Sequence, residues 1–151
     1  MKFRFKYLFV AVFLVSAVFL YFTYDDFDTA RIKLGGEQLR VLVAETRYQK
    51  YKGLGGRRGL DEYDGMLFKY FPPRKVGIVM RDMKFPIDIV WLNDGKVVDI
   101  APNVQPQPDT TEEKLKVYRP RKKANLVVEL PAGWSKKHSL EIGNKIKILK
   151  Q

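Results

Sequence analysis

Three acidic residues lie in or beside apolar stretches, where a carboxylate could take part in chemistry. They are Asp88, Asp99 and Glu129. Two carboxylates about 5 to 10 Å apart across a cleft would suit a glycosidase, with Asp88 and Glu129 as the acid pair. Three carboxylates could instead hold a hard cation such as calcium. No ligand-dense loop of the D-x-D-x-D-G type occurs in the sequence, so we predict no metal site.

The rest of the residue inventory excludes several other kinds of site. The chain of 151 residues has no Cys and a single His, His138. Thiolate chemistry and disulfides are therefore absent, and a His-pair zinc site is excluded. The glycine-rich run at 53–59 lacks the Lys-Ser/Thr pair of a phosphate loop, and it follows a predicted helix, which is the wrong context for dinucleotide binding. We expect no cofactor.

Asp88 lies in the most strongly patterned part of the chain. Residues 87–92 are mostly β-branched or aromatic, which predicts a strand. Pro86 should open this strand, because proline cannot donate to a sheet ladder. Asp94 and Gly95 tolerate positive φ, so a two-residue hairpin turn should follow. Both faces of the strand are apolar except at Asp88, which predicts a central strand with a carboxylate close to the core.

Asp88 has two interpretations. A buried charge is costly unless it is paired or hydrogen-bonded. Asp88 is therefore either a site residue with a shifted pKa or a structural group that ties down the connection at 81–85 through backbone N–H groups or a nearby Arg. We favour the structural interpretation.

The remaining sequence predicts further strands and two short helices. Thr46 and Gln49 have the spacing of a capping box, so a helix should begin there and end at Gly53. Residues 103–123 contain scattered prolines and no period, which predicts a long surface loop. The other predicted elements are strands at 31–34, 39–44, 65–68, 76–80, 96–100, 126–130 and 145–148, a rigid connector at 71–74, and a helix capped by Ser135 that runs to Leu140.

The N-terminal segment predicts a membrane anchor. Residues 7–24 carry no charge, and the segment is long enough to span a bilayer as a helix. Three basic residues precede this transmembrane segment and three acidic residues follow it, which places residues 1–6 in the cytoplasm. Residues 25–30 would be a tether, and residues 31–151 an extracytoplasmic domain. The alternative is a cleaved signal peptide and a secreted domain, but no good small-x-small cleavage site is present.

The net charge also points to a class of partner. The chain carries 28 Lys and Arg against 17 Asp and Glu, a formal charge of +11. This surplus favours an anionic partner such as membrane headgroups or an acidic wall polymer, although a solvated surface explains it equally well. We expect no nucleic-acid binding, because no aromatic and basic recognition motif is present.

Residues 80–91, MRDMKFPIDIVW, resemble the signature W-M-x-N-T-x-x-P-L-D-I-I-F of domain of unknown function 192 (DUF192), also named UPF0127. The chain is thereby identified as a membrane-anchored member of that family. The resemblance implies one β-sandwich-like or barrel-like domain at 31–149 and no known reaction. Relatives often carry paired Cys in the loop that spans 103–123, and this chain has none. Further segments match in order at 53–57, 64–68, 97–106, 126–133 and 143–146.

Two functions from different classes follow from these observations. The first is an extracytoplasmic accessory module that binds a small ligand or an anionic envelope component without catalysis, in a pocket near residues 81–86 with the long loop as a lid. The second is a hydrolase acting on a carbohydrate or cell-envelope substrate. The sequence has no recognisable nucleophile and base set, which favours the first; the oligomeric state stays open. The candidate ligand-binding residues are Arg57, Met80, Arg81, Asp88, Asn103 and Glu129.

Overall fold

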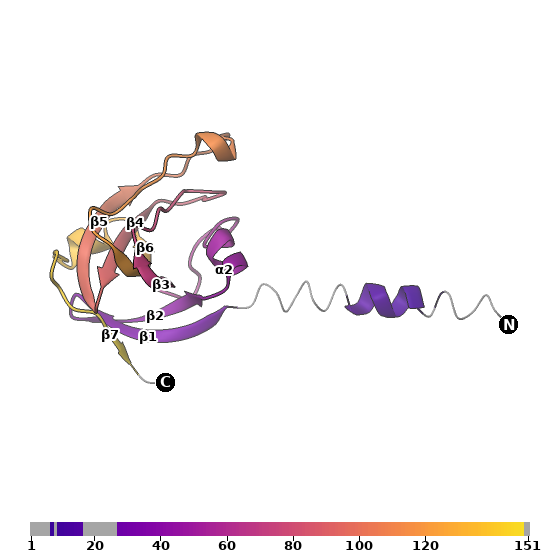
Figure 1. Cartoon of the computed structure of the whole chain (residues 1–151), viewed down its shortest axis with the longest axis horizontal. Coiled ribbons are helices and arrows are strands. Elements are labelled where there is room, and N and C mark those ends of the chain that lie inside the picture. The colour runs from indigo at the N-terminus through magenta and orange to yellow at the C-terminus, as the bar shows by residue number, and fades with distance from the viewer. Residues whose placement is uncertain (1–6, 8, 17–26, 150–151) are drawn as a thin grey trace.

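The computed structural model describes residues 7, 9–16 and 27–149 of the chain. A seven-stranded sheet with the strand order β5-β4-β6-β3-β2-β1-β7 forms the domain (Figure 1). The predicted mostly β domain with short helices is confirmed. Its elements are β1 (Asp28–Leu34), β2 (Glu37–Ala44), α2 (Arg47–Lys52), β3 (Gly65–Arg74), β4 (Ile87–Asn93), β5 (Lys96–Val104), the 3₁₀ helix η1 (Glu112–Lys114), β6 (Ala124–Pro131), α3 (Trp134–Lys137) and β7 (Lys147–Leu149).

The two edges of the sheet are joined by the C-terminal segment. The N–H of Val97 in β5 donates to the carbonyl of Asn144 at 2.9 Å, and the N–H of Ile146 donates to the carbonyl of Gly95 at 2.9 Å. The next residues form β7, which pairs with β1. This segment covers backbone groups that an open sheet edge would leave unpaired, so the sheet curls into a barrel-like shape.

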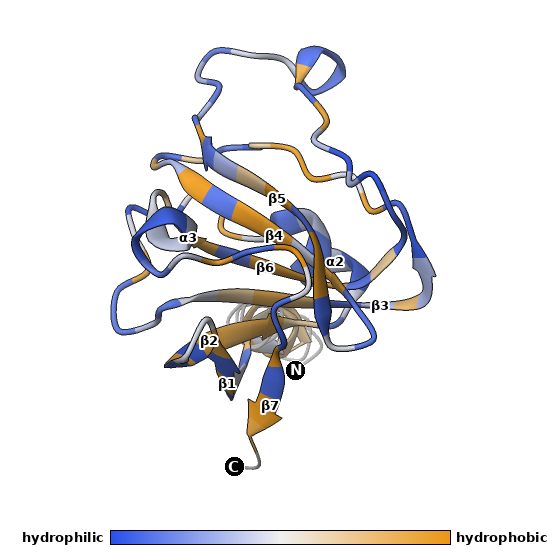
Figure 2. Ribbon diagram, turned by 90° about the vertical axis from the view of Figure 1, so that its left-hand side faces the viewer, coloured by the Kyte–Doolittle hydropathy of each residue, from blue (hydrophilic) through white to orange (hydrophobic). Residues whose placement is uncertain are grey.

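Both faces of the sheet are buried, by two separate hydrophobic clusters. The first cluster contains residues of β1 and β5, which lie far apart in the strand order, so it fills the space that the curved sheet encloses. The second lies on the other face, beneath α2 and the connection between β3 and β4. Figure 2 shows hydrophobic residues concentrated in the strands and hydrophilic residues in the loops. Every residue of β4 from 87 to 92 is buried, so the predicted central strand is confirmed.

The local turn and cap predictions are also confirmed. Asp94 and Gly95 have φ values of 48° and 72° and connect β4 to β5. Thr46 caps α2 by accepting from the N–H of Gln49 at 3.1 Å, and the side chain of Gln49 accepts in return from the N–H of Thr46 at 3.0 Å. Gly53 ends the helix with a φ of 51°.

Several predicted elements were wrong. Residues 76–80 are not a strand and make only an isolated bridge, between Ile78 and Tyr118. The expected connector at 71–74 belongs to β3, which tolerates two prolines because its ladder with β6 is interrupted between Lys69 and Arg74. β1 begins at Asp28, so the last residues of the expected tether are in the sheet.

The N-terminal segment is described only in part. Residues 9–16 are helical. Within 7, 9–16 and 27–149, none of the helices has the length and apolar character needed to cross a membrane. The rest of the predicted span, at 17–24, lies outside the described residues.

Candidate functional site

Asp88 and Glu129 lie on opposite faces of the sheet. In the antiparallel pair of β4 and β6, Asp88 is opposite Leu130, and Ile89 is opposite Glu129. Directly opposed residues share a face and successive residues alternate, so the two carboxyl groups point away from each other. The proposed hydrolase pair is therefore wrong, because the two acids cannot act across one cleft.

Asp88 is a structural residue. It is fully buried, and its carboxylate accepts from the N–H groups of Asn103 at 2.8 Å, Gly133 at 2.9 Å and Ser135 at 2.8 Å, and from the Ser135 hydroxyl. Burial by itself would raise the pKa of Asp88, but these hydrogen bonds together hold it below its ordinary value. Asp88 thus fastens β5 and the start of α3 to β4. The prediction that Asp88 ties down the connection at 81–85 was wrong, because all of its partners lie at 103, 133 and 135.

The same network explains why the helix prediction at Ser135 was wrong. The hydroxyl of Ser135 is committed to Asp88 and is not free to cap a helix. The helix is shorter than predicted and has Gly133 in the N-cap position, with a φ of 84°.

Asp99 is likewise held by a structural partner. Its carboxylate accepts from the Arg121 guanidinium at 2.7 Å and from the Arg121 N–H at 2.7 Å. Hydrogen bonds from Arg121 are the main reason why the pKa of Asp99 lies below its ordinary value. Across the described part of the chain, no group of three or more His, Asp or Glu side chains is arranged to hold a metal ion.

Glu129 has an entirely different environment. Glu129 is only 4% exposed, and it lies in the wall of a cavity of about 220 Å³ between α2, the sheet and the connection at 77–83. The other wall residues come from α2 and the turn that follows it, from β3 and the start of β4, and from the connection. They are Lys50, Tyr51, Lys52, Gly53, Leu54, Gly55, Phe68, Tyr70, Gly77, Ile78, Val79, Arg81, Met83 and Ile87.

The carboxyl of Glu129 has no hydrogen-bond or ion-pair partner among residues 27–149. Burial alone raises its pKa from 4.5 to about 8, so the group is mostly protonated at neutral pH. Tyr70 lies beside it, and the pKa of this phenol is raised to about 12 by burial and by the neighbouring Glu129. Nearly all buried polar groups in proteins have partners, so an unpaired acid in a cavity wall marks a candidate binding site.

Three cationic residues, Lys50, Lys52 and Arg81, belong to the cavity wall. The Lys50 ammonium lies 4.9 Å from the centre of the Tyr70 ring, and burial is the main cause that lowers the pKa of Lys50. The Arg81 guanidinium stacks on the Tyr51 ring at 3.8 Å and donates to the Tyr51 carbonyl at 2.8 Å. A buried, neutral acid in a cavity wall that also contains cationic residues is suited to an anionic group.

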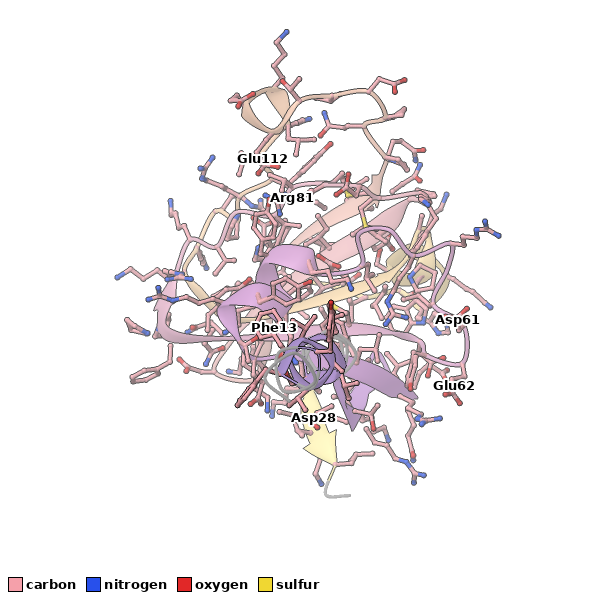
Figure 3. All side chains as sticks on the ribbon, turned by 90° about the vertical axis from the view of Figure 1, so that its right-hand side faces the viewer. Phe13, Asp28, Asp61, Glu62, Arg81 and Glu112 are labelled. Carbon is pink, nitrogen blue, oxygen red and sulfur yellow. The ribbon has the colours of Figure 1, made fainter. Side chains whose placement is uncertain are left out.

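Arg81 also connects the cavity to the long loop. Its Nε donates to Glu112 of η1 at 2.7 Å, and a second nitrogen of the guanidinium is bonded to the same carboxylate. Figure 3 shows the two side chains next to each other in the upper half of the view. A second cavity of about 420 Å³ lies between Arg81 and loop residues 107–112. We name the Arg81–Glu112 pair the latch, because it fastens the loop to the wall of the Glu129 cavity.

Two of the six predicted ligand-binding residues meet at this cavity, Arg81 and Glu129. Asp88 and Asn103 belong to the network on the other face, where Asn103 supplies a backbone N–H. The other two lie elsewhere: Met80 is in the core, and Arg57 pairs with Asp61 at 3.7 Å and lies over the Phe27 ring.

Lys50 and Tyr70 were not predicted. Tyr70 lies two residues after Phe68 in β3, so strand alternation would place both on one face. No feature of the sequence brings Lys50 of α2 to that face.

Comparison with known proteins gives a family and a fold. None of the curated proteins matches this chain. A crystal structure from Sinorhizobium meliloti 1021, solved under the provisional description of a transcription regulator, is similar with a TM-score of 0.72 and 26% identity, over 82% of this chain and 95% of that one. The crystal structure of a protein of unknown function from Novosphingobium aromaticivorans DSM 12444 is similar with a TM-score of 0.66 and 22% identity, over 80% of this chain and 84% of that one. The profile of DUF192, described as Uncharacterized ACR, matches residues 30–148. The chain belongs to the DUF192 family.

Proposed function

We propose that the domain is a binding module that takes a small anionic molecule into the Glu129 cavity without catalysis. The observation that carries this proposal is the buried carboxyl of Glu129, which has no partner within the described domain and lies in a wall shared with Lys50 and Arg81. A protonated carboxyl is a hydrogen-bond donor, and an anion supplies the acceptor that the cavity lacks.

The cavity also limits the size and the shape of the ligand. A volume of about 220 Å³ is below the roughly 300 to 1,000 Å³ of pockets that hold drug-sized ligands. Phe68, Ile78 and Ile87 make part of the wall apolar. A short-chain carboxylate or a small phosphate ester fits this description, with its anionic group toward Glu129 and Lys50 and its carbon atoms against the apolar wall.

The test measures the binding of butyrate, glycerol phosphate and butylamine by isothermal titration calorimetry at several pH values. We expect the anions to bind and the amine to fail. Anion affinity should fall about tenfold per pH unit above pH 8, because ionised Glu129 repels the anion. Glu129→Gln should remove this pH dependence, and Lys50→Met should weaken binding while Lys136→Met on α3 does not. Binding of butylamine but not of the anions would contradict the proposal.

We also propose that residues 7–24 anchor the domain outside the cytoplasm. Residues 9–16 are helical, and their large side chains are exposed, from 56% at Val10 to 72% at Phe13. Apolar surface of this kind is typical of segments that contact a membrane or a partner.

Extraction of membranes with alkaline carbonate tests this anchor. The full chain should stay with the membrane pellet, and protease added outside the cytoplasm should digest the domain. Release into the supernatant, or protection from that protease, would contradict the anchor. A shortened chain lacking residues 1–24 would support the signal-peptide alternative.

A further inference from the structure

The chain enters the domain at the end that carries α2. Asp28, where β1 begins, is the fourth residue after Tyr24, the last residue of the apolar segment, and four steps of the chain span at most about 14 Å. Asp28 pairs with Val43 near the end of β2, and β2 ends at Ala44, two residues before the cap residue Thr46. Figure 1 shows α2 near the start of β1, so an anchored chain would keep α2 close to the membrane surface.

Residues 45–58 carry the side chains that favour such a surface. They include five basic residues and one acidic residue, Glu45, which is itself paired with Lys69 at 2.6 Å. Tyr48 and Tyr51 are 38% and 59% exposed. Amphipathic rings favour the headgroup region, and each basic residue near an anionic leaflet contributes about fivefold in affinity.

A shallow groove of about 400 Å³ lies in the same surface, beside the Glu129 cavity. Its charged and aromatic lining residues are Tyr48, Tyr51, Lys52, Arg81, Asp82 and Lys84, of which Tyr51, Lys52 and Arg81 also line the cavity. Three cationic residues stand against one acid in the groove, and one of the three, Arg81, is also paired with Glu112 outside it. Asp28 and Asp61 lie on the same face (Figure 3), and Asp61 is paired with Arg57 at 3.7 Å.

We infer that residues 45–58 and this groove form a lipid-contacting surface, which holds the Glu129 cavity against a bilayer that contains anionic phospholipids. The inference rests on the proposed anchor and on the proposed cavity function. The group that this surface binds is the phosphate of a lipid headgroup, which basic and tyrosine side chains recognise. A ligand of the cavity then approaches from the membrane surface.

The test is hydrogen exchange of the full chain in lipid nanodiscs of phosphatidylcholine, with or without phosphatidylglycerol. Exchange of residues 45–58 should slow by about threefold or more when phosphatidylglycerol is present. The double variant Arg47→Glu with Arg58→Glu should lose this slowing. Its matched control, Lys136→Glu with Lys137→Glu, changes the charge equally on exposed residues of α3 and should keep the slowing.

Equal exchange in the two kinds of nanodisc, or an equal loss in the control variant, would overturn the inference. Slowing caused by free glycerol phosphate in phosphatidylcholine discs would also overturn it, because the surface would then bind a soluble phosphate. Recovery of the chain in the nanodisc fraction reports on the anchor, and butyrate binding in detergent reports on the cavity. A chain that passes both of these tests but shows no lipid-dependent slowing overturns only the lipid surface.

Discussion

At the scale of single residues, Asp88 and Glu129 show how the same functional group takes two roles. Asp88 is ionised and accepts four hydrogen bonds, which fix three segments of the chain. Glu129 is also buried but has no partner in the described domain, and its burial favours the neutral form. A carboxylate that is fully bonded has little capacity left for a ligand, whereas an unpaired acid keeps both its donor and its acceptor available.

Asp88→Asn should destabilise the domain. The Asn side chain places an NH₂ group among four donors, so at least one buried donor loses its acceptor, at a cost of about 2 to 4 kcal/mol. We expect Tm at pH 7 to fall by about 10 °C, while the exposed control Asp109→Asn leaves it unchanged. Because the folded-state pKa of Asp88 is lowered, its contribution is present above the unfolded-state pKa and disappears as the pH falls through the folded-state value. An unchanged Tm at pH 7 would contradict the structural role.

Glu129→Gln should have the opposite effect, and only at higher pH. The pKa of Glu129 is about 8 in the folded protein and near 4.5 when unfolded, so the folded state loses stability as the pH rises between these values. The upper limit of this loss is about 5 kcal/mol. Thermal unfolding should show a variant Tm higher by about 5 °C or more at pH 9 and equal at pH 4. The exposed control Glu141→Gln should show no such divergence, and parallel pH profiles for Glu129→Gln and the parent chain would contradict the account.

The structural role of Asp88 could be predicted from its place in an apolar strand, but its partners could not. Gly133 and Ser135 are distant in the sequence and reach Asp88 only because β6 lies beside β4. The same register places Asp88 and Glu129 on opposite faces of the sheet. Alternation within each strand was visible in the sequence, whereas the pairing of the strands was not.

At the scale of elements, the latch determines how the long loop is held. The ion pair of Arg81 and Glu112 joins η1 to the cavity wall, and stacking on Tyr51 fixes the guanidinium. The hydrogen bond from Arg81 is the main reason why the pKa of Glu112 lies below its ordinary value. Because Glu112 itself is exposed, the pair contributes mainly to the position of the loop and little to global stability.

Glu112→Gln should therefore loosen the loop without unfolding the domain. We expect faster proteolysis and faster amide exchange at residues 107–115, with Tm changed by no more than about 1 °C. Glu113→Gln, at the next exposed residue, is the matched control and should behave like the parent chain. Equal proteolysis of the two variants would show that the latch does not hold the loop.

Elements defined by local chemistry were predictable, and those defined by distant partners were not. The capping box at Thr46 and the Asp94-Gly95 turn depend on neighbouring residues and were predicted correctly. Residues 76–80 have the composition of a strand, but no place beside the following strand, β4, is open to them, because β4 already pairs with β5 and β6. They cover one face of the sheet instead and supply part of the cavity wall.

At the scale of the whole molecule, the apolar strand segments were sufficient to predict a mostly β domain. Closure of the sheet depends on the backbone pairing of residues 143–146 with the edge of β5. The pattern of side chains in the sequence gives no indication of this pairing. That closure and the parallel pair of β2 and β3 bring α2 over the face that carries Glu129. The candidate site therefore emerges only when the chain is folded, since its polar residues come from α2, β3, β6 and the connection before β4.

The most direct test of the account is a carbon-13 NMR titration of the Glu carboxyl groups, with the Glu129 signal assigned by its loss in Glu129→Gln. We expect an apparent pKa near 8 for Glu129, which rises further when saturating butyrate is added, because the anion binds the protonated form. An apparent pKa in the ordinary range, about 4 to 5, that does not respond to butyrate would contradict the account.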